Sequence, residues 1–174
     1  MWWRRSLIVI AAGLVLAACQ VRPLYLDQSS GGPLSPVPDL QAVVVDPPTT
    51  RAGQVLRNEL VFLMRGRGGE ASEQLYRLRI LSNVSSDPLA VELEEDLPAA
   101  VLLTMNATFI LSEIATERTL LTGESFATAS FDFSSQRFAN ERARRNAVDR
   151  AAKAVAVNIN TRLAAYFAAR RSKS

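Results

Sequence analysis

The chain has 174 residues, of which 48% are hydrophobic and 21% charged, so it is suited to one folded domain with a substantial core. Its 20 basic and 17 acidic side chains give a formal charge of +3, which provides no argument for nucleic-acid binding. The absence of histidine and the single cysteine exclude Ser-His-Asp and Cys-His catalysis, histidine-containing metal sites and an intramolecular disulfide, so we expect neither an enzyme nor a cofactor.

Residues 1–18 have the form of a secretory signal peptide. Two basic residues, Arg4 and Arg5, precede the apolar run from Leu7 to Ala18. As a helix this run would rise only about 18 Å, well short of the roughly 30 Å hydrocarbon core, so a permanent membrane span is the weaker interpretation. Removal of the segment would leave a net charge of about +1.

The signal peptide ends in Leu16-Ala17-Ala18-Cys19, which resembles the bacterial lipobox. We therefore expect cleavage before Cys19 and acylation of this cysteine, for example with palmitate, because more than one acyl chain makes anchoring stable. An aspartate after the cysteine would resemble an inner-membrane retention signal, and Gln20 stands there instead. The expected location is the periplasmic side of the outer membrane. An ordinary signal peptide followed by a chance cysteine is the alternative.

Residues 19–39 are predicted to be the lipidated cysteine and a flexible tether. The run Ser29-Ser-Gly-Gly-Pro33 and two further prolines, Pro36 and Pro38, have a composition that neither packs nor forms a helix. Such a tether spans roughly 25 Å as a coil and at most about 65 Å when extended. The folded domain is expected over residues 40–174.

The predicted elements of this domain follow the order β-α-β-β-β-α. A β-branched strand over 40–45 stops at Asp46-Pro47-Pro48, and a helix capped by Thr49 or Thr50 runs to about Arg65. Alternating strands are expected over 73–85, 99–114 and 119–133, with a solvated acidic loop over 87–96. An alanine-rich helix begins after Ser134-Ser135 and continues to about Arg170. Its spacing predicts one narrow buried stripe, made of Val148, Ala151, Val155, Ile159, Leu163 and Tyr166. One apolar sheet face and two amphipathic helices favour a two-layer α+β sandwich.

The alternation also predicts which side chains face the helices. The inner face is expected to contain Tyr76, Leu78, Ile80, Val84, Val101, Leu103, Met105, Ala107, Phe109, Leu111, Ala127, Ala129, Phe131 and Phe133. Arg77 and Arg79 share the outer face, where two guanidinium groups are able to hold phosphate, although two solvated arginines are the commoner case.

The rest of the outer face is rich in small uncharged polar side chains, among them Thr104, Asn106, Thr108 and Thr128. Such groups suit contact with another protein because they bring hydrogen bonds without the desolvation cost of charges, although plain solvent exposure is the alternative. The last helix has basic sides, including Arg142, Arg145 and Lys153, that suit an anionic partner or simple solvation. The sequence Gly123-Glu-Ser-Phe-Ala127 approximates a nucleophile elbow but falls inside a strand without any histidine.

Three stretches resemble the lipopolysaccharide (LPS)-assembly lipoprotein family LptE in its alphaproteobacterial form. They are Cys19-Gln-Val-Arg-Pro-Leu-Tyr25, Arg51-Ala-Gly-Gln-Val-Leu-Arg-Asn-Glu-Leu60 and Phe138-Ala-Asn-Glu-Arg-Ala-Arg-Arg-Asn-Ala147. The resemblance implies a four-stranded, mostly antiparallel (mixed) sheet with two helices packed on one face. It also implies a plug and assembly subunit for the outer-membrane β-barrel LPS translocon, which assists LPS insertion.

Under that resemblance we expect LPS, the translocon barrel and the outer membrane as partners. Arg77 and Arg79 become candidate contacts for LPS phosphates, and the outer sheet face a candidate contact for the barrel. No family motif assigns LPS-contacting residues in this chain. A periplasm-facing lipid carrier with an apolar cavity is the alternative function, and a carboxylate-only envelope hydrolase is left open by composition alone.

Overall fold

The computed structural model describes residues 37–65, 73–92 and 97–172, so the signal peptide, Cys19 and most of the predicted tether lie outside the described residues. The described elements are α2 (Val37–Gln41), β1 (Val43–Val45), α3 (Arg51–Arg65), β2 (Tyr76–Glu92), β3 (Leu97–Glu113), β4 (Thr119–Asp132) and α4 (Arg137–Arg171). The predicted α+β class is confirmed. Within these residues no helix is long and apolar enough to cross a bilayer.

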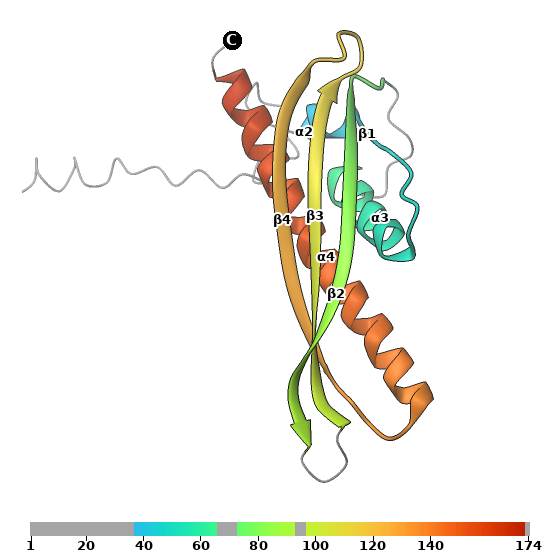
Figure 1. The fold of residues 1–174 in the computed structure, drawn as a ribbon. Coiled ribbons are helices and arrows are strands. Elements are labelled where there is room, and N and C mark those ends of the chain that lie inside the picture. Colours follow the sequence, from blue (N-terminus) through green and yellow to red (C-terminus); the bar gives the residue numbers. More distant parts are fainter. Residues whose placement is uncertain (1–36, 66–72, 93–96, 173–174) are drawn as a thin grey trace, which may run out of the picture.

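The four strands form one mixed sheet in the order β1-β2-β3-β4. β1 pairs parallel with β2, and the other pairs are antiparallel. Figure 1 shows α3 and α4 behind the sheet, with α4 running obliquely across it. The two-layer sandwich expected from the sequence is therefore present, with its core between the sheet and these helices.

The period-two pattern of the strands separates the two faces as predicted. On β3 the alternate residues Leu103, Met105, Phe109 and Leu111 are 0% exposed and point to the helices. Their neighbours Thr104, Thr108 and Ile110 are only half-buried, and Asn106 is exposed. Since successive side chains of a strand alternate between faces, one apolar face is enough to bind the sheet to its helices.

Helix α4 is buried over a wider arc than the single stripe expected from its spacing. Ala151, Val155, Ile159 and Leu163 of that stripe are fully buried, but additional residues are buried beside them. These are Ala147, Ala152, Ala156, Asn160, Ala164 and Phe167. The reason is that α4 contacts α3 as well as β3 and β4, so two sides of one helix are covered. Small alanine side chains permit this close approach.

Helix α3 begins at a threonine cap and is fastened to β1 by arginines. The Thr50 hydroxyl accepts a hydrogen bond from the Gly53 amide at 3.1 Å, as an N-cap residue does. Arg57 Nε donates to the Val45 carbonyl at 3.2 Å, and Arg65 Nη2 donates to that of Val43 at 2.5 Å. These bonds occupy carbonyls on the edge of this three-residue strand that is not paired with β2.

Two boundaries differ from the sequence prediction. Residues 37–41 form a short helix, so the expected strand over 40–45 is reduced to Val43–Val45. A proline is tolerated in the first helical turn, where its missing N–H has no intrahelical partner. The acidic segment expected as a loop over 87–96 is strand as far as Glu92, because β2 continues to pair with β3 beyond an irregularity at Pro88/Ala90.

Candidate functional site

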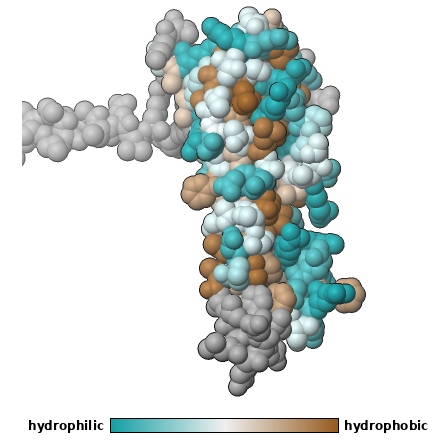
Figure 2. Space-filling model, viewed as in Figure 1, coloured by the Kyte–Doolittle hydropathy of each residue, from teal (hydrophilic) through white to brown (hydrophobic). Residues whose placement is uncertain are grey.

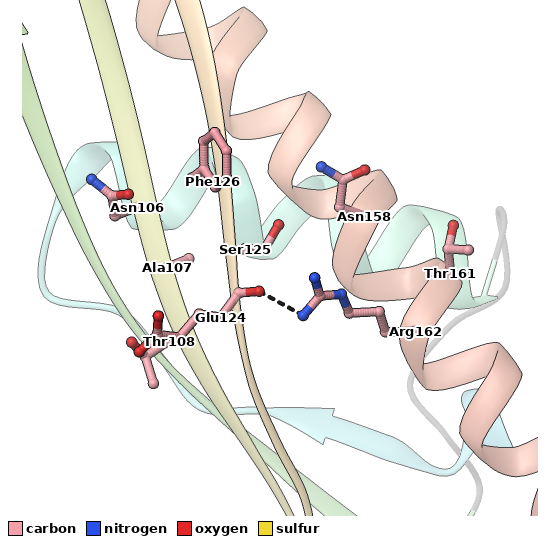
Figure 3. A pocket seen from close by; sticks show the side chains of 9 residues that line it. All are labelled: Asn106, Ala107, Thr108, Glu124, Ser125, Phe126, Asn158, Thr161 and Arg162. Atoms are coloured by element: carbon pink, nitrogen blue, oxygen red, sulfur yellow. Dashed lines mark hydrogen bonds between the residues drawn. The ribbon is translucent and has the colours of Figure 1, made fainter.

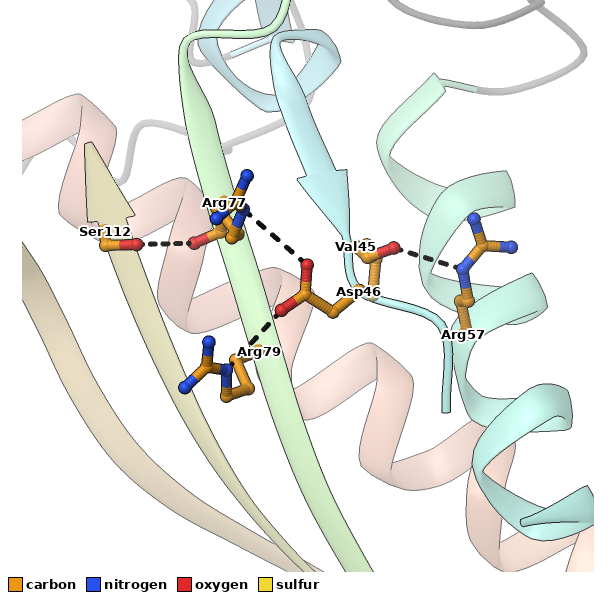
Figure 4. Close-up of polar contacts among 6 residues, drawn as sticks. All are labelled: Val45, Asp46, Arg57, Arg77, Arg79 and Ser112. Atoms are coloured by element: carbon orange, nitrogen blue, oxygen red, sulfur yellow. Dashed lines mark hydrogen bonds and ion pairs between the residues drawn. The ribbon is translucent and has the colours of Figure 1, made fainter. Parts of the chain in front are cut away.

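Arg77 and Arg79 lie on the outer face of β2 as predicted, and both contact the same carboxylate (Figure 4). Arg77 Nε is 3.7 Å from Asp46 Oδ1, and Arg79 Nε is 3.5 Å from Asp46 Oδ2. Asp46 follows β1, whose parallel pairing with β2 brings it beside the two arginines. The arginine side chains remain 51% and 63% exposed, so the cluster keeps one excess positive charge and open guanidinium edges.

A shallow hollow of about 450 Å³ lies beside these arginines, near the β3–β4 turn. Glu113 at its edge accepts a hydrogen bond from the Thr116 hydroxyl at 2.6 Å. This bond lowers the pKa of the Glu113 carboxyl below its usual value, and the charges of Arg118 and Arg170 act in the same direction. The hollow therefore contains fixed negative charge next to the arginines, which makes it a poor site for an isolated anion.

The outer sheet face has the predicted small polar character, interrupted by exposed apolar side chains. Thr104 and Thr128 are direct cross-strand partners, and Asn106 is the partner of Phe126. Figure 2 shows this face as mostly pale with separate brown areas, whereas strongly hydrophilic side chains gather mainly at its upper end and where α4 begins. Leu81 is 64% exposed and Phe126 is 68% exposed. This face is more apolar than the sequence pattern suggested.

An aromatic and basic groove occupies the junction of β4 and α4, and sequence analysis did not identify it. Its hollow measures about 710 Å³ and has phenylalanine and arginine side chains in its lining. Phe131, near the end of β4, packs against the core, and Phe133 follows the last residue of that strand. Phe138 in the first turn of α4 is 86% exposed. Arg137 and Arg144 add positive charge. Phenylalanines on both sides of the Ser134-Ser135 turn were the available signal.

The turn in this groove is held by a side chain of the helix that follows. Asn140 Oδ1 accepts from the Ser134 amide at 2.8 Å, and Asn140 Nδ2 donates to the Ser134 carbonyl at 2.6 Å. These two bonds fix the angle at which the chain leaves β4 and enters α4. The phenylalanines are thus positioned by a defined turn, and the groove combines an apolar wall with two arginines. Its one carboxylate, that of Glu141, is paired with Arg145 at 2.9 Å.

A second large hollow, of about 820 Å³, lies between β4 and α4 (Figure 3). Glu124, Ser125 and Phe126 line it from the strand, and Asn158, Thr161 and Arg162 from the helix. Arg162 Nη1 donates to the Glu124 carbonyl at 2.6 Å across the hollow. Ser125 is 5% exposed, and its hydroxyl has no hydrogen-bond partner in the described part of the chain. It lies inside a strand, so no nucleophile elbow is formed.

Comparisons with known proteins agree with this architecture. No curated protein sequence matches the chain. A putative lipoprotein from Caulobacter crescentus CB15 is similar in structure, with a TM-score of 0.63 and 22% identity over 79% of this chain and 98% of that one. Rare lipoprotein B from Shewanella oneidensis has a TM-score of 0.52 and 12% identity over 71% of this chain and 92% of that one.

The family model described as "LptE: Lipopolysaccharide-assembly" matches residues 38–163. This range contains every strand of the sheet, α3 and most of α4. It also includes two of the three motifs on which the expected family was based. That expectation is confirmed, and the chain belongs to the lipopolysaccharide-assembly family LptE.

Proposed function

We propose that this chain is an outer-membrane lipoprotein, anchored through an acylated Cys19, that serves as plug and assembly subunit of the β-barrel LPS translocon. Membership of the LPS-assembly family supports a role in LPS assembly. The proposal assigns LPS binding to the aromatic and basic groove, and barrel contact to the outer sheet face around Thr104, Asn106, Thr108 and Thr128. It assigns no catalytic role to any residue.

The observation that carries the LPS assignment is the composition of the groove. LPS presents acyl chains beside phosphate groups, so a complementary site needs an apolar wall next to cations. Phe131, Phe133 and Phe138 supply the wall, and Arg137 and Arg144 the cations. Charge-assisted bonds from arginine to phosphate contribute roughly 1.5 to 3 kcal/mol each. Arg77 and Arg79 are proposed as a second, weaker contact because Asp46 already offsets part of their charge.

The filled interior supports a plug over a lipid carrier. A carrier needs an apolar cavity able to enclose acyl chains. Between sheet and helices, Phe109, Leu111, Ile159 and Leu163 are each 0% exposed and belong to one packed cluster. A lipid is therefore better placed in a surface groove than inside the domain.

The test is LPS binding by the full chain in detergent, compared between two matched double variants. Phe138→Ala/Arg144→Ala removes one wall and one cation of the groove, and we expect at least tenfold weaker binding. Phe62→Ala/Arg51→Ala removes the same residue types from exposed positions of α3, where Phe62 is 55% exposed. If the two variants lose affinity equally, the groove is not the LPS site.

A further inference from the structure

β4 (Thr119–Asp132) is the last strand of the sheet, so one edge of its backbone has no neighbouring strand among the described residues. Arg162 Nη1 donates to the Glu124 carbonyl and Arg150 Nη2 to the Ser130 carbonyl, both at 2.6 Å. Alternate residues of a strand direct their backbone groups to the same edge. The amides and carbonyls of Phe126 and Thr128, between the two occupied carbonyls, therefore face this open edge.

The surroundings of this edge differ on its two faces. On the helix side lies the hollow of about 820 Å³, and the buried Ser125 hydroxyl in its lining has no hydrogen-bond partner among the described residues. On the outer side the Phe126 ring is 68% exposed. A ligand that fits this edge must offer backbone groups that hydrogen-bond to β4. It must also place a hydrogen-bonding side chain near the Ser125 hydroxyl and an apolar side chain on the Phe126 ring. An extended peptide with alternating side chains meets all three requirements.

We propose that residues 21–26 of this chain, Val-Arg-Pro-Leu-Tyr-Leu, add to the open edge of β4 as a fifth, antiparallel strand. The residues between this segment and α2 are long enough for the segment to reach the β4 edge. Asp39 is paired with Arg171 at 2.7 Å, and Arg162 lies nine residues, or about 14 Å, before Arg171 on the same helix. The ten residues of 27–36 span up to about 33 Å.

The direction follows from two ion pairs at the end of α4. Asp39–Arg171 and Glu113–Arg170 place both the start of the described domain and the beginning of the β3–β4 turn at the C-terminal end of α4. β4 runs away from that end. A segment that lies along β4 and then enters α2 must therefore run in the opposite direction, which makes the pairing antiparallel.

Pro23 determines which residues bond to β4. Proline has no N–H to donate, so in an edge strand the backbone at Pro23 must face away from the neighbouring strand. Residues 22, 24 and 26 then face the open edge of β4. With Leu24 opposite Phe126, the leucine covers the exposed ring, and Tyr25 is opposite Ser125 and enters the hollow. In the same register Cys19 lies beside Phe131, next to the aromatic and basic groove. This inference rests on the β4 edge and not on LPS binding.

A disulfide in the full-length chain tests the register. Opposed residues that exchange backbone hydrogen bonds have Cα atoms about 5.5 Å apart, within disulfide range. We expect Leu24→Cys/Phe126→Cys to form the intramolecular bond at least tenfold faster than Leu24→Cys/Leu81→Cys. Leu81 is the matched control because it is 64% exposed on the same face, two strands away. Equal rates overturn the proposal, as does a Phe126→Cys variant that instead links two copies of the chain.

Amide exchange gives an independent test of the hydrogen bonds. Leu24→Pro removes the N–H that would donate to Phe126, so exchange at Phe126 and Thr128 should accelerate at least tenfold. Leu34→Pro, in the connecting residues, is the matched control and should leave both amides protected. The amide of Phe109, in the central strand, reports whether either variant has unfolded. Unchanged exchange at Phe126 in Leu24→Pro would overturn the proposal.

Discussion

Phe109 is the largest side chain buried in the centre of the sheet, and its packing depends on a glycine across the strand pair. It is 0% exposed and stands directly opposite Gly123. A Cβ at Gly123 would lie 2.7 Å from the end of the Phe109 ring, so the ring occupies the space that glycine leaves. Aromatic side chains often cover a glycine on a neighbouring strand in this manner.

We predict that Phe109→Ala lowers the free energy of unfolding by roughly 3 to 5 kcal/mol, a large share of a typical 5 to 15. The loss combines the removed apolar contacts with the cavity above Gly123. Chemical denaturation followed by circular dichroism measures it. Leu81→Ala, in the same sheet but 64% exposed, is the control and should change stability by only about 0.5 kcal/mol. A similar small change in both variants would contradict the assignment of Phe109 to the core.

For single residues, alternation predicted which side chains face the helices, because every second residue of a strand shares a face. Ile80, Val84 and Phe131 are nevertheless only partly buried. It did not predict what the outward arginines contact. Arg77 and Arg79 meet Asp46 only because β1 pairs parallel with β2, in the register Val45–Leu78. Such a register depends on tertiary packing and not on the local pattern.

At the scale of elements, the β1–β2 edge presents two arginines and one carboxylate as a unit. If Arg77 and Arg79 bind LPS phosphates, Asp46 competes for the same guanidinium groups. We predict that Arg77→Ala/Arg79→Ala weakens LPS binding about threefold, less than the loss expected for the groove variant, while Asp46→Asn strengthens it. The opposite signs distinguish a ligand contact from a structural ion pair, whose loss would affect both variants in the same direction through folding.

Melting temperature must be followed in parallel for these variants. The ion pairs are exposed and 3.5 to 3.7 Å long, so their removal should change stability by less than about 1 kcal/mol. Unchanged LPS affinity in both variants would leave the aromatic and basic groove as the only proposed LPS contact.

The extent of each helix and strand, and of its buried surface, was the hardest feature to predict from the sequence. The acidic composition of 87–96 favours a loop, yet β2 extends to Glu92 because β3 supplies a partner for its backbone. Likewise, the spacing in the last helix indicated one buried stripe, and the second appears because α3 packs against α4. The groove beside Phe138 depends on the turn held by Asn140, which local periodicity does not encode.

For the whole molecule, membrane attachment is proposed to depend on Cys19 and not on the folded domain. The described helices include none able to cross a bilayer. The acyl groups proposed on Cys19 would supply the attachment. We predict that Cys19→Ala leaves the domain folded but releases it from membranes on washing without detergent. Retention as firm as that of the parent chain would show that acylation is not the anchor.

Helices α3 and α4 lie on one side of the sheet, and the described residues include no helix that covers the other side. On that outer face, Thr128 is exposed and has Thr104 as its direct cross-strand partner. If this face meets the wall of the barrel, Thr128→Arg would bury a charge without a counterion, which costs several kcal/mol in an interface.

We therefore predict that Thr128→Arg reduces co-purification of the translocon barrel at least tenfold. The domain itself should remain as stable as the parent, since an exposed substitution usually changes stability by only about 0.5 kcal/mol. The matched control is Gln54→Arg, which introduces the same charge at an exposed position of α3 on the helical side. Barrel recovery that falls with Gln54→Arg but not with Thr128→Arg would assign the contact to the helices, because only the substituted face differs between the two variants.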